Sequence, residues 1–160
     1  IHAYNKAYGL DFITARFSNV YGMYDDSDRV IPLWISQIVR GDKLVVYGER
    51  KVLDFTYIDD TVDGITKMIE RFDDVKGNAI NIAYGNGISL MSLAESLRKL
   101  LKAKNEITID DSRPGEVWNF EADISKARRL LGYEPKVGIE NGLKKTVAWY
   151  KRFFATEESS

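Results

Sequence analysis

The sequence predicts an α/β or α+β protein of the size of one domain. Short runs rich in β-branched and aromatic residues alternate along the chain with longer stretches whose apolar residues recur at the helical period. Of the 160 residues, 44% are hydrophobic and 29% are charged. That balance is typical of a soluble globular domain with its own core.

The first half of the chain predicts two helices, two strands and a loop. FITARF and LVVY are runs typical of strands, and a proline suits the first turn of the helix between them. The Gly, Asp, Ser and Asn residues before that helix indicate a loop. In chain order we expect a helix end at 1–8 closed by Gly9, a buried strand at 12–17, a loop at 18–30, a helix at 31–40 and a strand at 44–47.

Two helices of the second half have apolar stripes, the pattern of a helix that packs one face on a core. The first starts near Asp59, has acidic charge at its N-terminal end, and carries Val62, Ile65, Met68, Ile69 and Phe72 on one face. Ser89 is the expected N-cap of the second. The apolar face of this second helix comprises Leu90, Leu93, Leu97, Leu100 and Leu101.

Shorter elements complete the chain, and the tryptophans Trp34, Trp118 and Trp149 are expected to be aromatics of the core or of a pocket wall. The remaining elements are strands at 79–83 and 106–110, a helix at 123–132 that ends at Gly132, a last helix with Leu143, Val147 and Tyr150 on one face, and a frayed tail at 154–160.

The composition excludes several classes of function. Lys and Arg number 23 against 24 acidic residues, a net charge of −1, so no basic field for nucleic acid is expected. The chain has no cysteine and a single histidine, His2, which excludes disulfides and thiolate metal sites and leaves little for zinc. No apolar run approaches the roughly 18 residues of a membrane span. We therefore expect a cytoplasmic protein that binds no metal, nucleic acid or membrane.

Asn19 is the first candidate binding residue. It stands in RFSNVYG, where a strand ends, and ligand sites of α/β folds lie beyond the carboxyl ends of strands. Its amide both donates and accepts hydrogen bonds, as a sugar diphosphate requires. The alternative is an Asx-turn, in which the same side chain caps its own loop.

Three segments together resemble the extended short-chain dehydrogenases, the NAD-dependent sugar epimerase/dehydratase family. The segments are RFSNVYG at 16–22, VYGERKVLDFTYIDD at 46–60 and SRPGEVWNFEADISKARRLLGYEP at 112–135, and the resemblance spans about residues 1–150. It implies an α/β fold: the C-terminal, substrate-binding part of an extended Rossmann-type architecture whose N-terminal dinucleotide-binding half is missing. The implied domains are a Rossmann remnant at 1–30, a small α/β nucleotide-sugar-binding domain at 31–153 and a tail at 154–160.

The resemblance also implies roles for particular residues. It places Asn19 and Arg113 on the substrate diphosphate, Tyr47 against the nucleotide base, Glu116 on the ribose hydroxyls, and Phe17 and Ser18 near the nicotinamide and the sugar ring. A guanidinium fork matches phosphate oxygens, and stacking suits any base. Taken without the resemblance, Tyr47 is equally a core aromatic of its strand. Arg113 and Glu116 are then a solvated ion pair at a Pro-Gly turn.

Leu53 departs from the family's pattern. The family has an arginine immediately before the aspartate that is Asp54 here, and the preceding loop of this chain is one residue shorter. Arg50 or Lys51 in that loop is the candidate replacement, although a lysine supplies only a point charge to phosphate.

The carboxylates of Asp54, Asp59 and Asp60 are expected to be structural. Asp59 or Asp60 is the expected cap of the helix that follows.

No catalytic pair is expected in this chain. The family's base is the tyrosine of Y-x-x-x-K, whose lysine lies one helical turn away and lowers the pKa of the phenol. The string from Tyr47 to Lys51 has this spacing, but it follows a strand and contains Gly48, so we expect a loop there. The true pair is expected upstream of Ile1.

The glycine-rich dinucleotide loop is also absent from the sequence, because Gly85-Asn86-Gly87 does not open into G-x-G-x-x-G. We expect the intact protein to bind NAD and this chain alone to bind none.

The resemblance implies that the intact protein is an NAD-dependent nucleotide-sugar 4-epimerase, an isomerase closest to the UDP-glucose 4-epimerases. It would interconvert UDP-sugars through a 4-keto intermediate and form a homodimer. A dTDP-glucose 4,6-dehydratase or a related reductase is the alternative within the family. The alternative from another class is a non-catalytic fragment that only binds a nucleotide sugar, and we expect this chain alone to be inactive.

Overall fold

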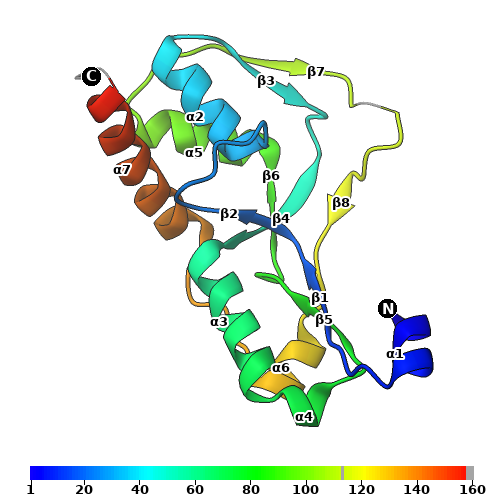
Figure 1. The fold of residues 1–160 in the computed structure, drawn as a ribbon. Coiled ribbons are helices and arrows are strands. Elements are labelled where there is room, and N and C mark those ends of the chain that lie inside the picture. Colours follow the sequence, from blue (N-terminus) through cyan, green and yellow to red (C-terminus); the bar gives the residue numbers. More distant parts are fainter. Residues whose placement is uncertain (113, 158–160) are drawn as a thin grey trace.

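The computed structural model describes residues 1–112 and 114–157, and helices alternate with strands along them (Figure 1). None of the described helices combines the length and the apolar character needed to cross a membrane. The elements in chain order are α1 (His2–Tyr8), β1 (Thr14–Phe17), β2 (Asn19–Tyr21), α2 (Val30–Arg40), β3 (Leu44–Tyr47), β4 (Val52–Tyr57), α3 (Ile58–Glu70), α4 (Phe72–Val75), β5 (Ala79–Ile82), β6 (Gly87–Ser89), α5 (Leu90–Leu100), β7 (Ile107–Asp110), β8 (Asn119–Phe120), α6 (Ser125–Leu131) and α7 (Ile139–Glu157).

β4 is the central strand of the fold. It pairs in parallel with β2 and β8 and antiparallel with β6. Two further parallel pairs join β1 to β5 and β3 to β7. Parallel strands that are connected through helices define the α/β class, so this part of the sequence prediction is confirmed.

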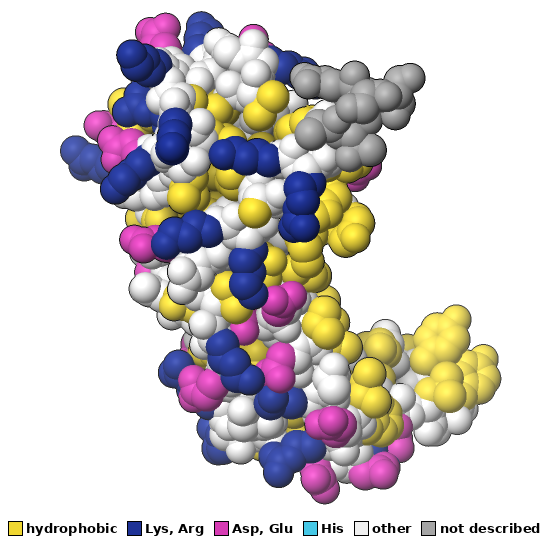
Figure 2. All heavy atoms as spheres, turned by 90° about the vertical axis from the view of Figure 1, so that its left-hand side faces the viewer, with side chains coloured by type: hydrophobic (Ala, Val, Ile, Leu, Met, Phe, Trp, Pro, Cys, Tyr) yellow, Lys and Arg dark blue, Asp and Glu magenta, His cyan; other side chains and the backbone are white. Residues whose placement is uncertain are grey.

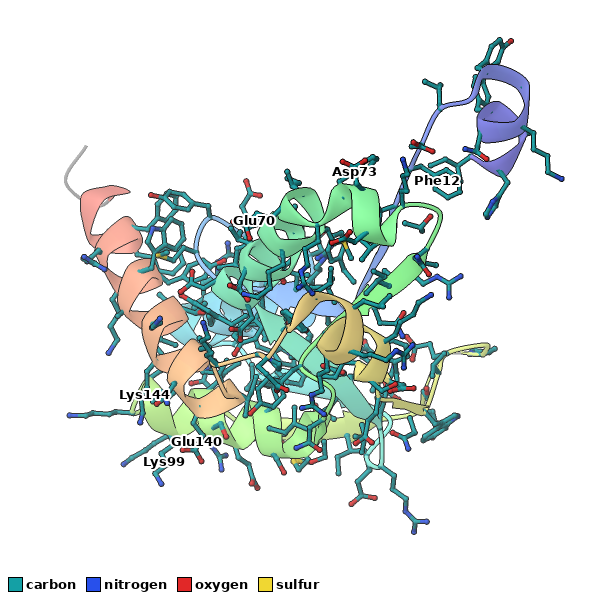
Figure 3. The ribbon with its side chains drawn as sticks, turned by 90° about the horizontal axis from the view of Figure 1, so that it is seen from below. Phe12, Glu70, Asp73, Lys99, Glu140 and Lys144 are labelled. Carbon is teal, nitrogen blue, oxygen red and sulfur yellow. The ribbon has the colours of Figure 1, made fainter. Side chains whose placement is uncertain are left out.

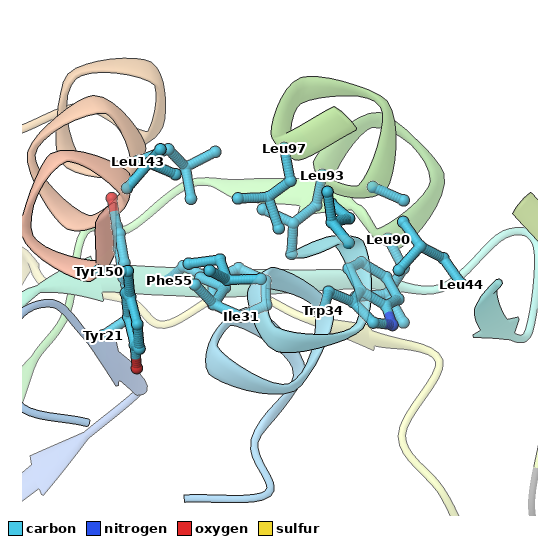
Figure 4. Packing of buried hydrophobic residues seen from close by; sticks show 14 of the residues in the cluster. Tyr21, Ile31, Trp34, Leu44, Phe55, Leu90, Leu93, Leu97, Leu143 and Tyr150 are labelled. Carbon is cyan, nitrogen blue, oxygen red and sulfur yellow. The ribbon is translucent and has the colours of Figure 1, made fainter. Parts of the chain in front are cut away.

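Two hydrophobic cores hold these elements together. The larger one packs α2, α5 and α7 against β3 and β4, and Figure 4 shows Leu93 and Leu97 of α5 pointing toward Phe55 of β4. The smaller core packs α3 and α6 against β5, around the fully buried Ile82 and Tyr133. The two cores lie at opposite ends of the molecule in Figure 1, with β4 running between them.

The loop predicted at 18–30 is wrong in part, because Asn19–Tyr21 form strand β2. β2 lies in register with β4, Asn19 opposite Phe55. Three residues are too short a run to show an alternating pattern by themselves, and their backbone hydrogen bonds come from a distant strand. β4 has no clear strand signal either, because the buried polar residues Asp54 and Thr56 interrupt its apolar ones.

Most of the apolar stripe of α3 is left uncovered by the described residues. Val62 is 52% exposed and Ile69 is 70% exposed, and only Met68 of the stripe is buried, at 4%. The buried face of α3 consists of Asp60, Thr61, Gly64 and Met68. By contrast, Leu90, Leu93 and Leu97 of α5 are buried as their pattern predicts.

α1 projects from the body of the molecule (Figures 2 and 3). At its base, His2 meets the ring of Phe12 edge to face, with the ring centroids 4.9 Å apart. Tyr4 and Tyr8 of α1, together with Ile1 before the helix and Leu10 after it, are exposed apolar residues, from 57% for Leu10 to 72% for Tyr8. The apolar projection at the right of Figure 2 is therefore a second uncovered apolar surface, in addition to the exposed stripe of α3.

The two predicted helix caps have different outcomes. The Ser89 hydroxyl oxygen accepts a hydrogen bond from the Ser92 N–H at 3.1 Å, so the cap of α5 is confirmed. The cap of α3 by Asp59 or Asp60 is wrong, because β4 runs straight into the helix and Tyr57 takes the N-cap position. Asp60 instead accepts the N–H groups of Lys136 and Val137, at 2.8 and 2.9 Å.

Candidate functional site

Three hollows adjoin β4 or the residues bonded to it. The first has a volume of about 550 Å³ and is lined by Gly48, Glu49, Arg50, Ile109, Asp110, Asp111, Ser112 and Trp118. The second has a volume of about 230 Å³ and is lined by Asn19, Val20, Tyr21, Asp25, Arg29, Val30, Ile31, Pro32, Leu53 and Phe55. The third has a volume of about 420 Å³ and is lined by Arg16, Phe17, Ser18, Asn81, Phe120, Glu121, Ala122 and Asp123.

Gly48 and Trp118 shape the first hollow. Gly48 has φ 84°, and a Cβ at this position would lie 3.3 Å from the Ser112 Cβ and 3.4 Å from the indole of Trp118. A side chain here would therefore need both a left-handed backbone and space that the neighbours occupy. Trp118 is 55% exposed, and it stands at the hollow as a pocket-wall aromatic. Tyr47, the last residue of β3, precedes the glycine and is half-buried.

Lys51 and Glu116 form an ion pair next to this hollow. The Lys51 ammonium lies 2.9 Å from Oε2 of Glu116, and the Ser112 hydroxyl donates to the same oxygen at 3.0 Å. Lys51 is only 9% exposed, so its charge is committed to this partner. Arg50 lines the first hollow, and Arg113 lies outside the described residues.

Asn19 lies in the second hollow at the carboxyl side of β1. Its Nδ2 donates to the Asp54 carbonyl at 2.9 Å, a bond that reaches across to β4 rather than back into its own loop as an Asx-turn requires. That bond uses one N–H of the amide. Leu53 and Phe55 line the same hollow, because side chains two apart on a strand share a face.

Asp54 faces the opposite side of β4, and its carboxylate contacts Ser18 and Ala122, which line the third hollow. It is fully buried and accepts the N–H groups of Gly85 at 2.9 Å, Ala122 at 3.2 Å and Tyr84 at 3.3 Å. Burial raises the pKa of its carboxyl above the usual value, and these N–H donors oppose the shift. Asp54 therefore joins β4 to two other segments, the turn at 84–85 and the chain at Ala122, in agreement with the structural role expected of it.

The two neighbours Ser18 and Phe17 differ in their surroundings: Ser18 is bonded to β4, whereas Phe17 is exposed. The Ser18 hydroxyl lies 2.5 Å from the Thr56 hydroxyl and 3.5 Å from the Asp54 carboxylate, which fixes it against β4. Phe17 is 46% exposed and lines the third hollow.

The turn at Gly85 does not fit a dinucleotide. Dinucleotide loops open into a helix whose N–H groups face the pyrophosphate. Here Gly85-Asn86-Gly87 leads into strand β6. The Gly85 N–H donates to Asp54, and the Tyr84 N–H donates to the Thr56 hydroxyl at 2.9 Å and to Asp54 at 3.3 Å. The string from Tyr47 to Lys51 likewise spans the end of β3, a turn and the approach to β4, so it is not a helical Y-x-x-x-K pair. Among residues 1–112 and 114–157 no cluster of carboxylates and histidine is suited to hold a metal ion.

Arg29 and Ser112 are site residues that the sequence did not single out. Ser112 stands just before Arg-Pro-Gly in the sequence, and its contact with Glu116, four positions away, is visible only in the structure. Arg29 reads as part of a polar loop, and only the packing of α2 against β4 brings it to the hollow that contains Asn19. The one sequence signal that points to Arg29 is its position as a basic residue directly before a helix.

Comparisons with known proteins agree on one family. Residues 1–83 match the model of the NAD dependent epimerase/dehydratase family. An uncharacterized protein of Methanocaldococcus jannaschii is 36% identical over 150 residues, which are 93% of this chain and 45% of that protein. A UDP-glucuronate 4-epimerase of Thermodesulfobacterium geofontis is 35% identical, over 94% of this chain and 46% of its own length.

A solved structure shares the fold. The crystal structure of UDP-glucuronic acid 4-epimerase from Bacillus cereus, in complex with UDP-glucuronic acid and NAD, superposes with a TM-score of 0.89 at 30% identity. The superposition covers 95% of this chain and 49% of that one. The chain thus spans about half the length of the relatives it matches.

Proposed function

The chain belongs to the NAD-dependent epimerase/dehydratase family, and we propose that it forms the nucleotide-sugar-binding portion of an NAD-dependent sugar 4-epimerase. In the intact protein this enzyme interconverts UDP-sugars through a 4-keto intermediate. We also propose that residues 31–153 form the nucleotide-sugar-binding domain and that residues 1–30 belong to the Rossmann part.

The observation that carries the proposal is the set of three hollows around β4. A nucleotide sugar has three chemically distinct parts: a flat base with its ribose, a charged diphosphate and a polar sugar ring. We assign the nucleoside to the first hollow, the diphosphate to the second and the sugar ring to the third. Their volumes are of the order expected for parts of one small-molecule site.

The first hollow suits a nucleoside. Trp118 offers an exposed aromatic face, and Tyr47 stands at the adjoining strand end. Base stacking on an aromatic side chain contributes roughly 1–3 kcal/mol. A carboxylate has about four acceptor positions, so Glu116 can accept ribose hydroxyls while it holds Lys51 and Ser112. Arg113 follows Ser112 in the chain, and we propose that its guanidinium contacts the diphosphate.

The second hollow suits a diphosphate. The Asn19 amide has a second N–H beyond the one that it gives to Asp54, and this group is a donor for a phosphate oxygen. Hydrogen bonds to charged acceptors are worth about 1.5–3 kcal/mol, more than neutral ones. We propose that the sugar ring and the nicotinamide lie at the third hollow, beside Phe17 and Ser18, which line it.

The hydride chemistry belongs to NAD and to a tyrosine–lysine pair, which we propose to lie in parts of the protein outside these 160 residues. The relatives are about twice as long as this chain, and the only glycine-rich turn among the described residues that resembles a dinucleotide loop is bound to Asp54. On this proposal the chain by itself binds and orients a nucleotide sugar without turning it over.

Isothermal titration of the chain with UDP-glucose, UDP-glucuronic acid, dTDP-glucose and NAD tests the proposal. We expect the UDP-sugars to bind and Asn19→Ala to weaken them roughly tenfold, the equivalent of one lost charge-assisted hydrogen bond. Asn141→Ala, an exposed asparagine of α7 that lines none of the three hollows, is the matched control.

The proposal fails if no uridine nucleotide binds at millimolar concentration. Tighter binding of dTDP-glucose than of either UDP-sugar would favour the dehydratase alternative instead.

A further inference from the structure

A fourth hollow is formed by helices α5 and α7 and by the turn that follows α5. It has a volume of about 480 Å³, within the range of small-molecule sites, and none of its lining residues lines the other three hollows. Figure 3 shows Lys99, Glu140 and Lys144 together at the edge of the molecule where the two helices meet. The lining residues are Ser96, Lys99, Leu100, Lys102, Glu140 and Lys144.

The charges that line this hollow are not balanced. Lys99, Lys102 and Lys144 are exposed, and their ammonium groups form no ion pair or hydrogen bond with the described part of the chain. Glu140 stands one helical turn before Lys144 on α7, a spacing that allows an ion pair, yet within the described residues the two are not paired. Three cations against one carboxylate leave an excess of positive charge, and a bound anion would relieve the repulsion among the lysines.

We propose that this hollow binds a compact polyanion, a small molecule that carries at least two phosphate or carboxylate groups and no nucleobase. An ammonium is a point charge with three donors, which suits both kinds of oxygen. The half-buried Ser96 adds a hydroxyl donor to the lining. No aromatic side chain lines the hollow, so a base would have nothing on which to stack. The site is separate from the nucleotide-sugar site and does not depend on the function proposed for it.

The backbone of Lys102 holds one of these cations in an unusual conformation. Lys102 has φ 54°, in the left-handed region, and its N–H donates to the Lys99 carbonyl at 3.1 Å where α5 ends. Glycine is the usual residue in this conformation, because a side chain there strains the backbone. Here a lysine takes the position and adds the third ammonium to the hollow. At the ends of α1, α2 and α6 the left-handed residues are glycines: Gly9, Gly41 and Gly132.

The helix dipole explains only part of this cluster. Cations near the C-terminal end of a helix stabilise it, and Lys99 and Lys102 lie at that end of α5. Lys144 lies in the second turn of α7, near the N-terminal end, where the dipole does not favour a cation. What the three lysines share is the hollow that they line.

Isothermal titration at low ionic strength with sodium pyrophosphate and with citrate tests the site. We expect both probes to bind, and Lys99→Gln combined with Lys144→Gln to weaken binding roughly tenfold. The matched control combines Lys6→Gln on α1 with Arg129→Gln on α6, two exposed cations that line none of the four hollows. It makes the same change in net charge and should bind as the wild type does. Added salt should weaken binding through screening.

Two further variants should change affinity and stability in different directions. Glu140→Gln removes the carboxylate that lines the hollow, so pyrophosphate should bind roughly three times more tightly. The same change removes an acidic charge from the first turn of α7, so the melting temperature should not rise. Lys102→Gly should weaken binding by a similar factor without lowering the melting temperature, because glycine suits the left-handed conformation. Damage to the fold cannot produce either combination.

The inference is overturned if neither probe binds the wild-type chain at millimolar concentration, or if the lysine pair and the control pair bind equally well. Weaker binding after Glu140→Gln would also contradict it. Binding of pyrophosphate alone, or of citrate alone, that depends on the lysines supports the site and shows whether it takes phosphates or carboxylates. A chain that binds pyrophosphate in this way but no UDP-sugar would remove the proposed function and leave this inference in place.

Discussion

Helices α5 and α3 have similar sequence patterns and opposite surroundings. Both carry an apolar stripe at the helical period. In α5, Leu93 and Leu97 are completely buried, whereas in α3 Val62 is 52% and Ile69 is 70% exposed. The period of the apolar residues predicts that a helix forms and which of its faces is apolar. It does not predict that the same chain covers that face.

The difference arises from the neighbours that each helix meets. α5 lies between α2 and α7 in the larger core, so its leucines have partners on both sides. α3 instead turns its small and polar residues inward. A Cβ on Gly64 would lie 2.6 Å from the Cγ2 atom of Ile82 in β5, and the Asp60 carboxylate binds the backbone of the 136–137 segment. Close backbone approach, two hydrogen bonds and the buried Met68 hold α3, and the rest of its stripe faces outward.

Leu93→Ala tests the buried side of this comparison and has the largest expected effect. Loss of a fully buried leucine should lower the free energy of unfolding by about 3 kcal/mol, through lost burial and the cavity left behind. Urea unfolding followed by circular dichroism measures it. Leu33→Ala, a leucine of α2 that is 39% exposed, is the control and should cost much less. Equal losses in the two variants would mean that α5 is not part of the core.

Gly64→Ala tests the close packing of α3 and has an intermediate effect. On an open helix, alanine is more stable than glycine by about 1 kcal/mol. Here the new methyl would meet Ile82, which is fully buried and has no room to move, so we expect a net loss of about 1 kcal/mol. Thr66→Ala, on the exposed face of the same helix, should be neutral or stabilising. A stabilising Gly64→Ala would show that α3 does not pack on β5.

The parts of the fold that sequence reasoning predicts are those decided by near neighbours. Ser89 caps α5 through a residue three positions away, and Gly9 and Gly132 end their helices in the left-handed conformation, as expected. β2 escapes prediction because its strand character comes from pairing with β4. The exposure of the α3 stripe escapes it because that depends on which other helices are present.

In the candidate site, too, the sequence points to some residues, whereas other contacts depend on tertiary packing. The motif order led to Asn19, Tyr47 and Glu116, and their roles as ligand contacts stay predictions. Arg113, predicted with them, lies outside the described residues. The pairing of Lys51 with Glu116, 65 positions apart, and the arrival of Arg29 beside Asn19 are products of tertiary packing. A cation in a loop has many possible partners in the sequence, so its actual partner can be identified only from the folded structure.

Ile69→Ser tests the exposed side of the comparison and has the smallest expected effect. A side chain that is 70% exposed loses little burial when it becomes polar, and isoleucine and serine have similar helix propensities. We therefore expect the free energy of unfolding to change by less than about 0.5 kcal/mol. Met68→Ser, one position earlier and 4% exposed, is the matched control and should cost several times more. A large loss at Ile69 that grows with protein concentration would mean that a second copy covers the stripe in solution, because self-association makes stability depend on concentration. In that case the two helices would differ only in which chain buries them.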